Sequence, residues 1–260
     1  MLLAQWREES KEVEGIVAKI HEGGRAHVLG LIDMLTPPDD PSDHKAHYAL
    51  HCLGVHLLEI EDDEPRQVFG EALASRLGDD TPVGVRKYLC QELQTAGGPE
   101  AVAALGKLLT HPELCEPAAR ALVAIGDGAC EPLLAALSKV KDKCRLTLVQ
   151  NLGAAQCKKA VAALTKALGA GDAYVRIAAA WSLANIGHPD AVAPVFKTAD
   201  VEPGWERIQK TKACLVLAEK LLAAGEQDAA KTMYQLLRDS RKDPAEAYVR
   251  EAAEQALAGM

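Results

Sequence analysis

The sequence predicts an all-α protein, an α-solenoid of stacked antiparallel helical hairpins. Hydrophobic residues make up 48% of the 260-residue chain but aromatic residues only 4%, so the core must consist of small and medium aliphatic side chains, as in closely packed helices. No stretch alternates β-branched or aromatic residues with polar ones, as a half-buried strand would. One pattern of about thirty residues recurs along the chain, which is typical of repeat architectures.

Residues 1–80 are expected to form divergent, acidic hairpins that continue as one solenoid into the repeats of residues 81–260. They carry 7 Lys/Arg against 17 Asp/Glu, whereas the remainder carries 22 against 20. The acidic run EIEDDEP at 59–65 ends one helix and starts another, where its charges favour a helix N-terminus. A solvated helical surface is the simplest interpretation of this acidity, and a surface that meets a basic partner is the alternative.

The segment HKAHYALHCLGVH at 44–56 holds four of the eight histidines. At about 100° per residue, His44, His47 and His51 fall on one face of a helix that points outward in either register against the repeat. His44 and His51 would be separated by about 10.5 Å along the axis, so three metal ligands from this straight helix would be strained. We therefore predict a polar helix face without a metal; a pH-sensitive patch and a metal that takes a further ligand from elsewhere stay open.

Four copies of the repeat align without gaps, at residues 86–105, 115–134, 145–164 and 176–195. Each has a leucine followed three residues later by Ala or Ile, which gives an apolar stripe at helical spacing. These reference leucines are Leu93, Leu122, Leu152 and Leu183. A fifth copy occupies residues 214–233 after an insertion around TADVEPGWE, and a partial copy ends the chain. One hairpin alone buries too few aliphatic side chains to be stable, so neighbouring hairpins must stack.

The turn inside each hairpin follows the stripe directly. Gly97, Gly126 and Gly187 are expected to end the first helix in a left-handed conformation, and a proline then starts the second helix after two of them. Gln156 occupies the glycine position of the third copy. A residue other than glycine should cost on the order of 1 kcal/mol there or force a different turn.

The segment DAYVRIAAAWSLANIGHPDAV at 172–192 resembles the consensus of short bacterial HEAT repeats, also called phycobilisome-lyase-like repeats. The resemblance covers residues 81–260 well and residues 1–80 loosely. It implies a right-handed solenoid whose Val-Arg helices line the concave side, with a structural arginine ladder. The ladder positions are Arg86, Arg145, Arg176 and Arg250, and a break is expected at Cys115 and Cys214, which replace the arginine.

If those helices face inward, the residue two before each reference leucine should point into the concave groove. With the three histidines, these residues form the predicted partner-binding set: His44, His47, His51, Gln91, Arg120, Gln150, Trp181, Glu219 and Gln255. Trp181 either anchors a partner or fills space left by neighbouring alanines. Trp205, in the insertion, either closes over the groove or pins the insertion.

The function predicted from these features is a non-enzymatic scaffold, adaptor or assembly subunit of a larger complex, which binds a protein or peptide in its groove. No common nucleophile, phosphate-binding or zinc-protease motif occurs, so neither a catalytic residue nor a cofactor is predicted. The net charge of −8 disfavours nucleic acid as a partner. A bilin-lyase-like enzyme or chaperone subunit and a histidine-cluster metal protein are the alternatives.

The apolar stretches and the cysteines of the sequence predict where in the cell the protein is located. The opening residues lack the apolar core of a secretory signal, and no later stretch has the ~18 apolar residues of a membrane span, so membrane insertion is not expected. The seven cysteines are widely spaced and odd in number, which favours buried thiols over a disulfide framework. Together these features predict a cytoplasmic protein.

Overall fold

The computed structural model describes residues 13–36 and 41–260, and every regular element in these ranges is a helix. The chain divides into two compact units, Met1–Pro132 and Leu133–Met260. Both consist of stacked antiparallel helical hairpins, which confirms the all-α solenoid class. None of the described helices is long and apolar enough to span a membrane.

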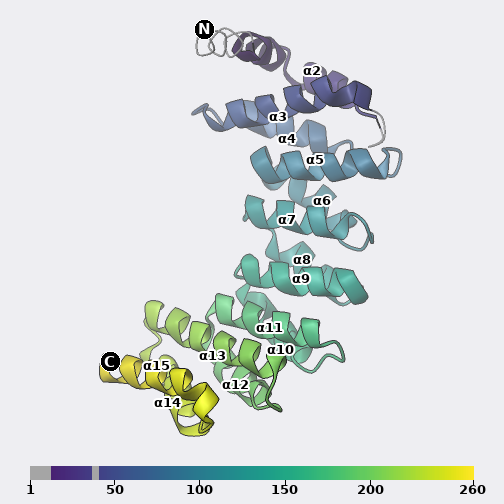
Figure 1. Cartoon of the computed structure of the whole chain (residues 1–260). Helices are drawn as coiled ribbons and strands as arrows, with labels where there is room; N and C mark the ends of the chain where they lie inside the picture. Colours follow the sequence, from purple (N-terminus) through teal and green to yellow (C-terminus); the bar gives the residue numbers. More distant parts are fainter. Residues whose placement is uncertain (1–12, 37–40) are drawn as a thin grey trace, which may run out of the picture. The chain divides into compact units, whose positions relative to one another are not determined.

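The first unit begins with a helical stretch at residues 13–22. It continues with α2 (Gly24–Ile32), a 3-10 turn (Pro41–Asp43), α3 (His44–Leu58), α4 (Glu64–Ala74), α5 (Val83–Ala96), α6 (Val102–Leu108) and α7 (Cys115–Ile125). The helices form two layers: α3 packs on α5 and α5 on α7, while α2 packs on α4 (Figure 1). The next helix, α8 (Cys130–Leu137), contains the boundary between the units.

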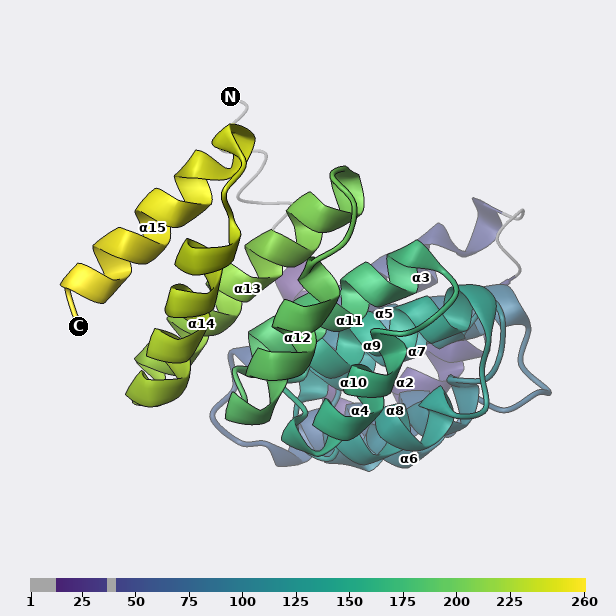
Figure 2. The same cartoon turned by 90° about the horizontal axis from the view of Figure 1, so that it is seen from below.

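The second unit contains α9 (Asp142–Ala154), α10 (Val161–Ala167), α11 (Ala173–Ile186), α12 (Val192–Ala199), α13 (Trp205–Ala223), α14 (Gln227–Ser240) and α15 (Ala247–Ala258). Here α11 lies between α9 and α13, and α12 packs against α13 (Figure 2). The chain ends with α14 packed on α13 and α15 packed on α14. The first helices of three successive hairpins are therefore neighbours, as the stacking argument requires.

The apolar spine follows the predicted stripe. All four reference leucines are fully buried at 0% exposure. In the copy formed by α7 and α8, Leu133 is the fully buried residue of the second helix, and the aligned Leu134 is only half-buried. The turn of this copy is one residue shorter than the others, so the gapless alignment is wrong by one residue there.

Small residues bring adjacent helices close. A Cβ atom added at Gly153 of α9 would lie 2.5 Å from the Cα, Cβ and Oγ atoms of Ser182 on α11. The Ser182 hydroxyl donates a hydrogen bond to the Val149 carbonyl at 2.8 Å, so this close approach also satisfies a buried polar group. Only glycine fits at position 153 without moving the facing backbone.

The turns confirm the left-handed expectation at Gly187 (φ 65°, ψ 39°). Gly126 has a positive φ of 78°, but its ψ of −68° lies outside the left-handed helical region. The expectation is wrong at Gly97, which is extended with φ −76° and ψ 164°. The amide that follows it, Gly98 N–H, donates to the Glu100 carboxylate at 2.8 Å, whereas a left-handed cap commonly directs that amide to the helix end.

Gln156 takes the left-handed conformation itself, with φ 49°. Its N–H donates to the Gly153 carbonyl and the Cys157 N–H to the Leu152 carbonyl, both at 3.1 Å. The fifth copy makes the same pair of hydrogen bonds around Gly225, with φ 83°. The two turns thus have the same hydrogen bonds, although one contains Gln156 and the other Gly225. Gln156 therefore carries the backbone strain of a positive φ.

Cysteine usage differs in part from the expectation of thiols. The structure has thiols at Cys52, Cys90, Cys115, Cys144 and Cys214. Cys130 and Cys157 are disulfide-bonded, so the expectation is wrong at these two positions. Burial raises the pKa of the Cys90 and Cys214 thiols to about 12, which keeps both protonated and unreactive at neutral pH.

Candidate functional site

The predicted partner-binding residues lie at the surface of both units. His44, His51, Gln91 and Arg120 of the first unit are exposed, as are Gln150, Glu219 and Gln255 of the second. His47 and Trp181 are half-buried. The helical register therefore points this row outward, as expected, and its binding of a partner stays a prediction.

Two of these residues come together in a groove of about 350 Å³ in the second unit. We call it the aromatic groove. It is formed by α9, α11 and α13 and lined by Leu146, Gln150, Tyr174, Ile177, Ala178, Trp181, Ser182, Asn185, Trp205 and Gln209. Of the predicted set, it contains Gln150 and Trp181.

Three aromatic side chains line this groove. Tyr174 and Trp205 are 63% and 52% exposed, and their ring centroids lie 5.5 Å apart with the planes tilted by 60°. Trp205 is the first residue of α13, so it lies at a helix start and faces the groove. Trp181 is half-buried and also lines the groove, and its role as an anchor for a partner stays a prediction.

The polar part of the lining is neutral. Gln150, Asn185 and Gln209 supply side-chain amides, and no charged residue lines the groove. Among the described residues, none of these amides makes a hydrogen bond to the protein. Sequence reasoning missed Asn185 and Gln209, although each follows a groove tryptophan by four residues and so shares its helix face.

An arginine ladder lies directly beside the aromatic residues. The Nε and Nη2 atoms of Arg176 donate to the two carboxylate oxygens of Glu206, each at 2.7 Å, and its Nη1 donates to the carbonyls of Ala170 and Gly171. This bidentate pair joins α11 to α13. The Arg176 hydrogen bonds and the ion pair with Lys210 lower the pKa of Glu206 to about 2.

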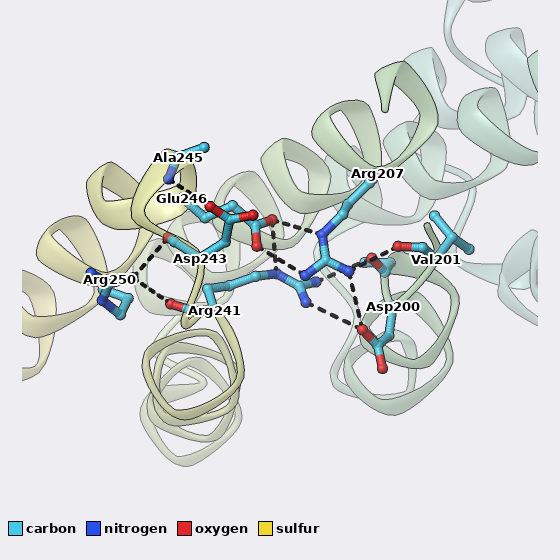
Figure 3. Close-up of polar contacts among 9 residues, drawn as sticks. Asp200, Val201, Arg207, Arg241, Asp243, Ala245, Glu246 and Arg250 are labelled. Carbon is cyan, nitrogen blue, oxygen red and sulfur yellow. Dashed lines mark hydrogen bonds and ion pairs between the residues drawn. The ribbon is translucent and has the colours of Figure 1, made fainter. Parts of the chain in front are cut away.

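Arg207 repeats this arrangement one hairpin later. Its Nε and Nη2 atoms donate to the Glu246 carboxylate, both at 2.9 Å, and its Nη1 donates to the Val201 carbonyl at 2.9 Å (Figure 3). The predicted break at Cys214 is therefore wrong. The helix α13 starts two turns earlier than the alignment assumes, so the ladder arginine comes before the buried Cys214.

Arg241 extends the ladder and was not predicted. It is fully buried, with Nη2 donating to the Ala199 carbonyl at 3.2 Å. Its guanidinium lies 3.7 Å from Asp200 and 3.6 Å from Glu246. Figure 3 shows the Arg207 and Arg241 guanidinium groups pointing toward each other between these two carboxylates, which balance their charge.

The other predicted ladder members differ in their contacts. Arg250 donates to the backbone carbonyls at 241 and 243, at 2.7 and 3.1 Å. Arg86 is buried and pairs with Asp79 at 2.8 Å. The half-buried Arg145 makes no side-chain hydrogen bond or ion pair with any described residue. Arg86 and Arg250 thus each bind the loop before their own helix, whereas Arg176 and Arg207 each join consecutive hairpins through a bidentate carboxylate.

On the histidine face of the first unit, His47 and His51 contact two different carboxylates. His47 Nε2 lies 3.0 Å from Asp43 Oδ2, and His51 Nδ1 lies 3.3 Å from both oxygens of Glu92. Glu92 is buried, and burial raises its pKa, with an opposing contribution from His51. The Tyr88 hydroxyl donates to the His47 carbonyl at 2.6 Å.

His44 is separate from that pair of contacts. It lines an apolar cavity of about 710 Å³ between residues 13–20, the end of α2 and the start of α3. Within residues 13–36 and 41–260 there is no group of three or more His, Cys, Asp and Glu side chains placed to hold a metal.

Comparisons with known proteins agree with the repeat architecture. The family model for HEAT repeats matches residues 130–216. Among solved structures, an engineered protein is 22% identical with a TM-score of 0.50, over 93% of this chain and 72% of that one. At this identity the likeness shows the fold alone.

Two further structures are similar at a lower level. The complex of CpcE and CpcF of phycocyanin lyase from Nostoc sp. PCC7120 matches with 19% identity and a TM-score of 0.45, over 87% of this chain and 93% of that one. The archaeal HEAT-like repeats protein from Thermococcus onnurineus NA1 matches with 13% identity and a TM-score of 0.38, over 93% and 98%. No curated protein matches the chain significantly.

Proposed function

We propose that this protein is a non-enzymatic interaction module that binds a protein or peptide segment in the aromatic groove, as an adaptor or assembly subunit in the cytoplasm. The observation that carries the proposal is the group of three groove aromatics, two of which are more than half exposed. Exposed aromatic side chains next to hydrogen-bonding groups are typical of binding hot spots.

The ionisable groups support binding over catalysis. Glu206, whose pKa is lowered most clearly, is fully engaged by Arg176 and Lys210. The groove itself offers amide, indole and phenol groups, and amides do not transfer protons at neutral pH. A chain with a net charge of −8 also suits a protein partner better than a nucleic acid.

A displayed library of random peptides tests the proposal without a known partner. Peptides are selected on the full-length protein and counter-selected on the double variant Trp181→Ala, Trp205→Ala. We expect peptides that lose at least about tenfold in affinity, equivalent to about 1.4 kcal/mol, on the double variant. The matched control is Gln94→Ala, at an exposed residue of the first unit, and this variant should bind the peptides unchanged.

Circular dichroism of the double variant checks that its helical content is kept. If no selected peptide distinguishes the protein from a folded double variant, the aromatic groove is not the binding site. If the Gln94→Ala control loses binding equally, recognition lies on the first unit and the proposal fails.

A further inference from the structure

The aromatic groove has flat apolar surfaces at an angle to each other. The ring centroids of Tyr174 and Trp205 are 5.5 Å apart and the planes are tilted by 60°, so the two rings touch and together present aromatic faces at an angle on which a ring can pack. Both are more than half exposed, and exposed adjoining aromatic surface marks an interaction site. A proline ring is apolar and rigid and packs well on such faces.

The polar side-chain groups of the groove can form hydrogen bonds with the backbone of a bound peptide. The amides of Gln150, Asn185 and Gln209 make no hydrogen bond within the described protein, and the indole Nε1–H groups of Trp181 and Trp205 are also free of partners there. A polyproline II segment has no internal hydrogen bonds, and its carbonyls are available as acceptors. Amide and indole N–H groups can donate to those carbonyls.

Other peptide conformations match this lining less well. A helical ligand has satisfied its own backbone, so the free amides would be buried without partners at a cost. An added strand needs an exposed sheet edge, and every described element that lines the groove is a helix.

Charge narrows the choice of partner further. No charged residue lines the groove, and the nearest ladder charges, Arg176 and Glu206, pair with each other at 2.7 Å. A strongly acidic or basic peptide would therefore find no opposite charge to compensate its desolvation. The groove suits a neutral ligand.

We propose that the aromatic groove binds a neutral, proline-rich segment of a partner protein in the polyproline II conformation. This inference rests on the proposed function and specifies the chemistry of its partner. Tyr174 and Trp205 hold the proline rings, and the groove amides bind the backbone carbonyls.

The test uses the full-length protein and a fluorescein-labelled, capped oligoproline peptide followed by anisotropy. A Gly-Ser peptide of equal length is the comparator. We expect oligoproline to bind about tenfold or more tightly than the comparator, with less than about a twofold change between about 0.05 and 0.5 M salt.

Tyr174→Ala should weaken oligoproline binding by about tenfold, and Trp205→Phe should keep most of it because a ring face remains. Lys107→Glu, on the exposed surface of the first unit, should bind as the parent does. Equal affinity for the two peptides, or full binding by Tyr174→Ala, overturns the inference. If library peptides without proline lose affinity in the groove double variant, this inference fails and the proposed function stands.

Discussion

Glu206→Gln tests the ladder at the carboxylate that joins α11 to α13. Glu206 accepts two hydrogen bonds at 2.7 Å from Arg176, and its Oε1 lies 2.8 Å from Lys210 Nζ. The Lys210 side chain is only 2% exposed. The substitution keeps the shape and one acceptor oxygen but removes the charge, so Lys210 stays buried without a carboxylate, which is unfavourable.

The expected magnitude follows from the pKa of Glu206. Pairing lowers it from an ordinary value of 4.5 to about 2. A lowered carboxyl pKa stabilises the folded state above the unfolded pKa, and this stabilisation is lost as pH falls through the folded pKa. The difference corresponds to about 3 kcal/mol at neutral pH, of which about 2 kcal/mol is lost between about pH 7 and 3.

Urea unfolding followed by tryptophan fluorescence measures this effect in the second unit. Trp181 and Trp205 both lie there, and a Trp6→Phe background removes the third indole. Glu206→Gln should lower the free energy of unfolding by about 3 kcal/mol near pH 7 and by only about 1 kcal/mol near pH 3.

The matched control is Glu251→Gln. Glu251 is exposed on α15 and makes no ion pair with any described residue, so this change should have little effect at either pH. An equal loss for Glu206→Gln at both pH values, or a loss below about 1 kcal/mol at neutral pH, would show that the ladder carboxylate does not stabilise the unit as argued.

Five further substitutions test the turns, the helix packing and the first unit. In urea unfolding, Gln156→Gly should raise the free energy of unfolding by about 1 kcal/mol and Gly225→Gln should lower it by a similar amount, because both positions have positive φ. A change of the same sign in both variants would contradict this. Gly153→Ala should lower the free energy of unfolding by about 1–3 kcal/mol, because its Cβ would meet the facing backbone at 2.5 Å. Gly30→Ala, whose Cβ would have no atom within 4 Å, should raise it by up to about 1 kcal/mol. Burial raises the pKa of Glu92, so the stability of the folded state falls as pH rises through that pKa. Glu92→Gln should remove this fall from the pH profile of the melting temperature. An unchanged profile in this variant would refute the argument.

The hairpins could be predicted because each one carries its own local signal. An apolar stripe followed by a turn residue is contained in about twenty residues, and burial of the reference leucines confirms it. The alignment failed in the second copy, which carries this signal at Leu122, Ile125 and Gly126. The turn after Gly126 is one residue short, and local similarity does not fix the length of a turn.

The ladder was harder to predict because its partners are distant in sequence. Arg207 binds Glu246, 39 residues later, and no sequence pattern near either residue predicts this ion pair. Similarity placed the arginine position at Cys214 because the insertion hides the early start of α13. The aromatic groove has the same limitation, since Tyr174 and Trp205 meet only once α11 and α13 are stacked.

The ladder and the groove are parts of one structural arrangement. Arg176 follows Tyr174 by two residues on α11, and Glu206 directly follows Trp205 on α13. The bidentate ion pair therefore fixes the spacing of the two helix ends that carry the exposed rings. An aromatic pair held by rigid helices loses less side-chain freedom when a ligand binds, which favours affinity. The buried charges of the ladder, which are costly as isolated ions, thus have a reason to lie beside a neutral groove, because they hold its aromatic walls in place without entering it.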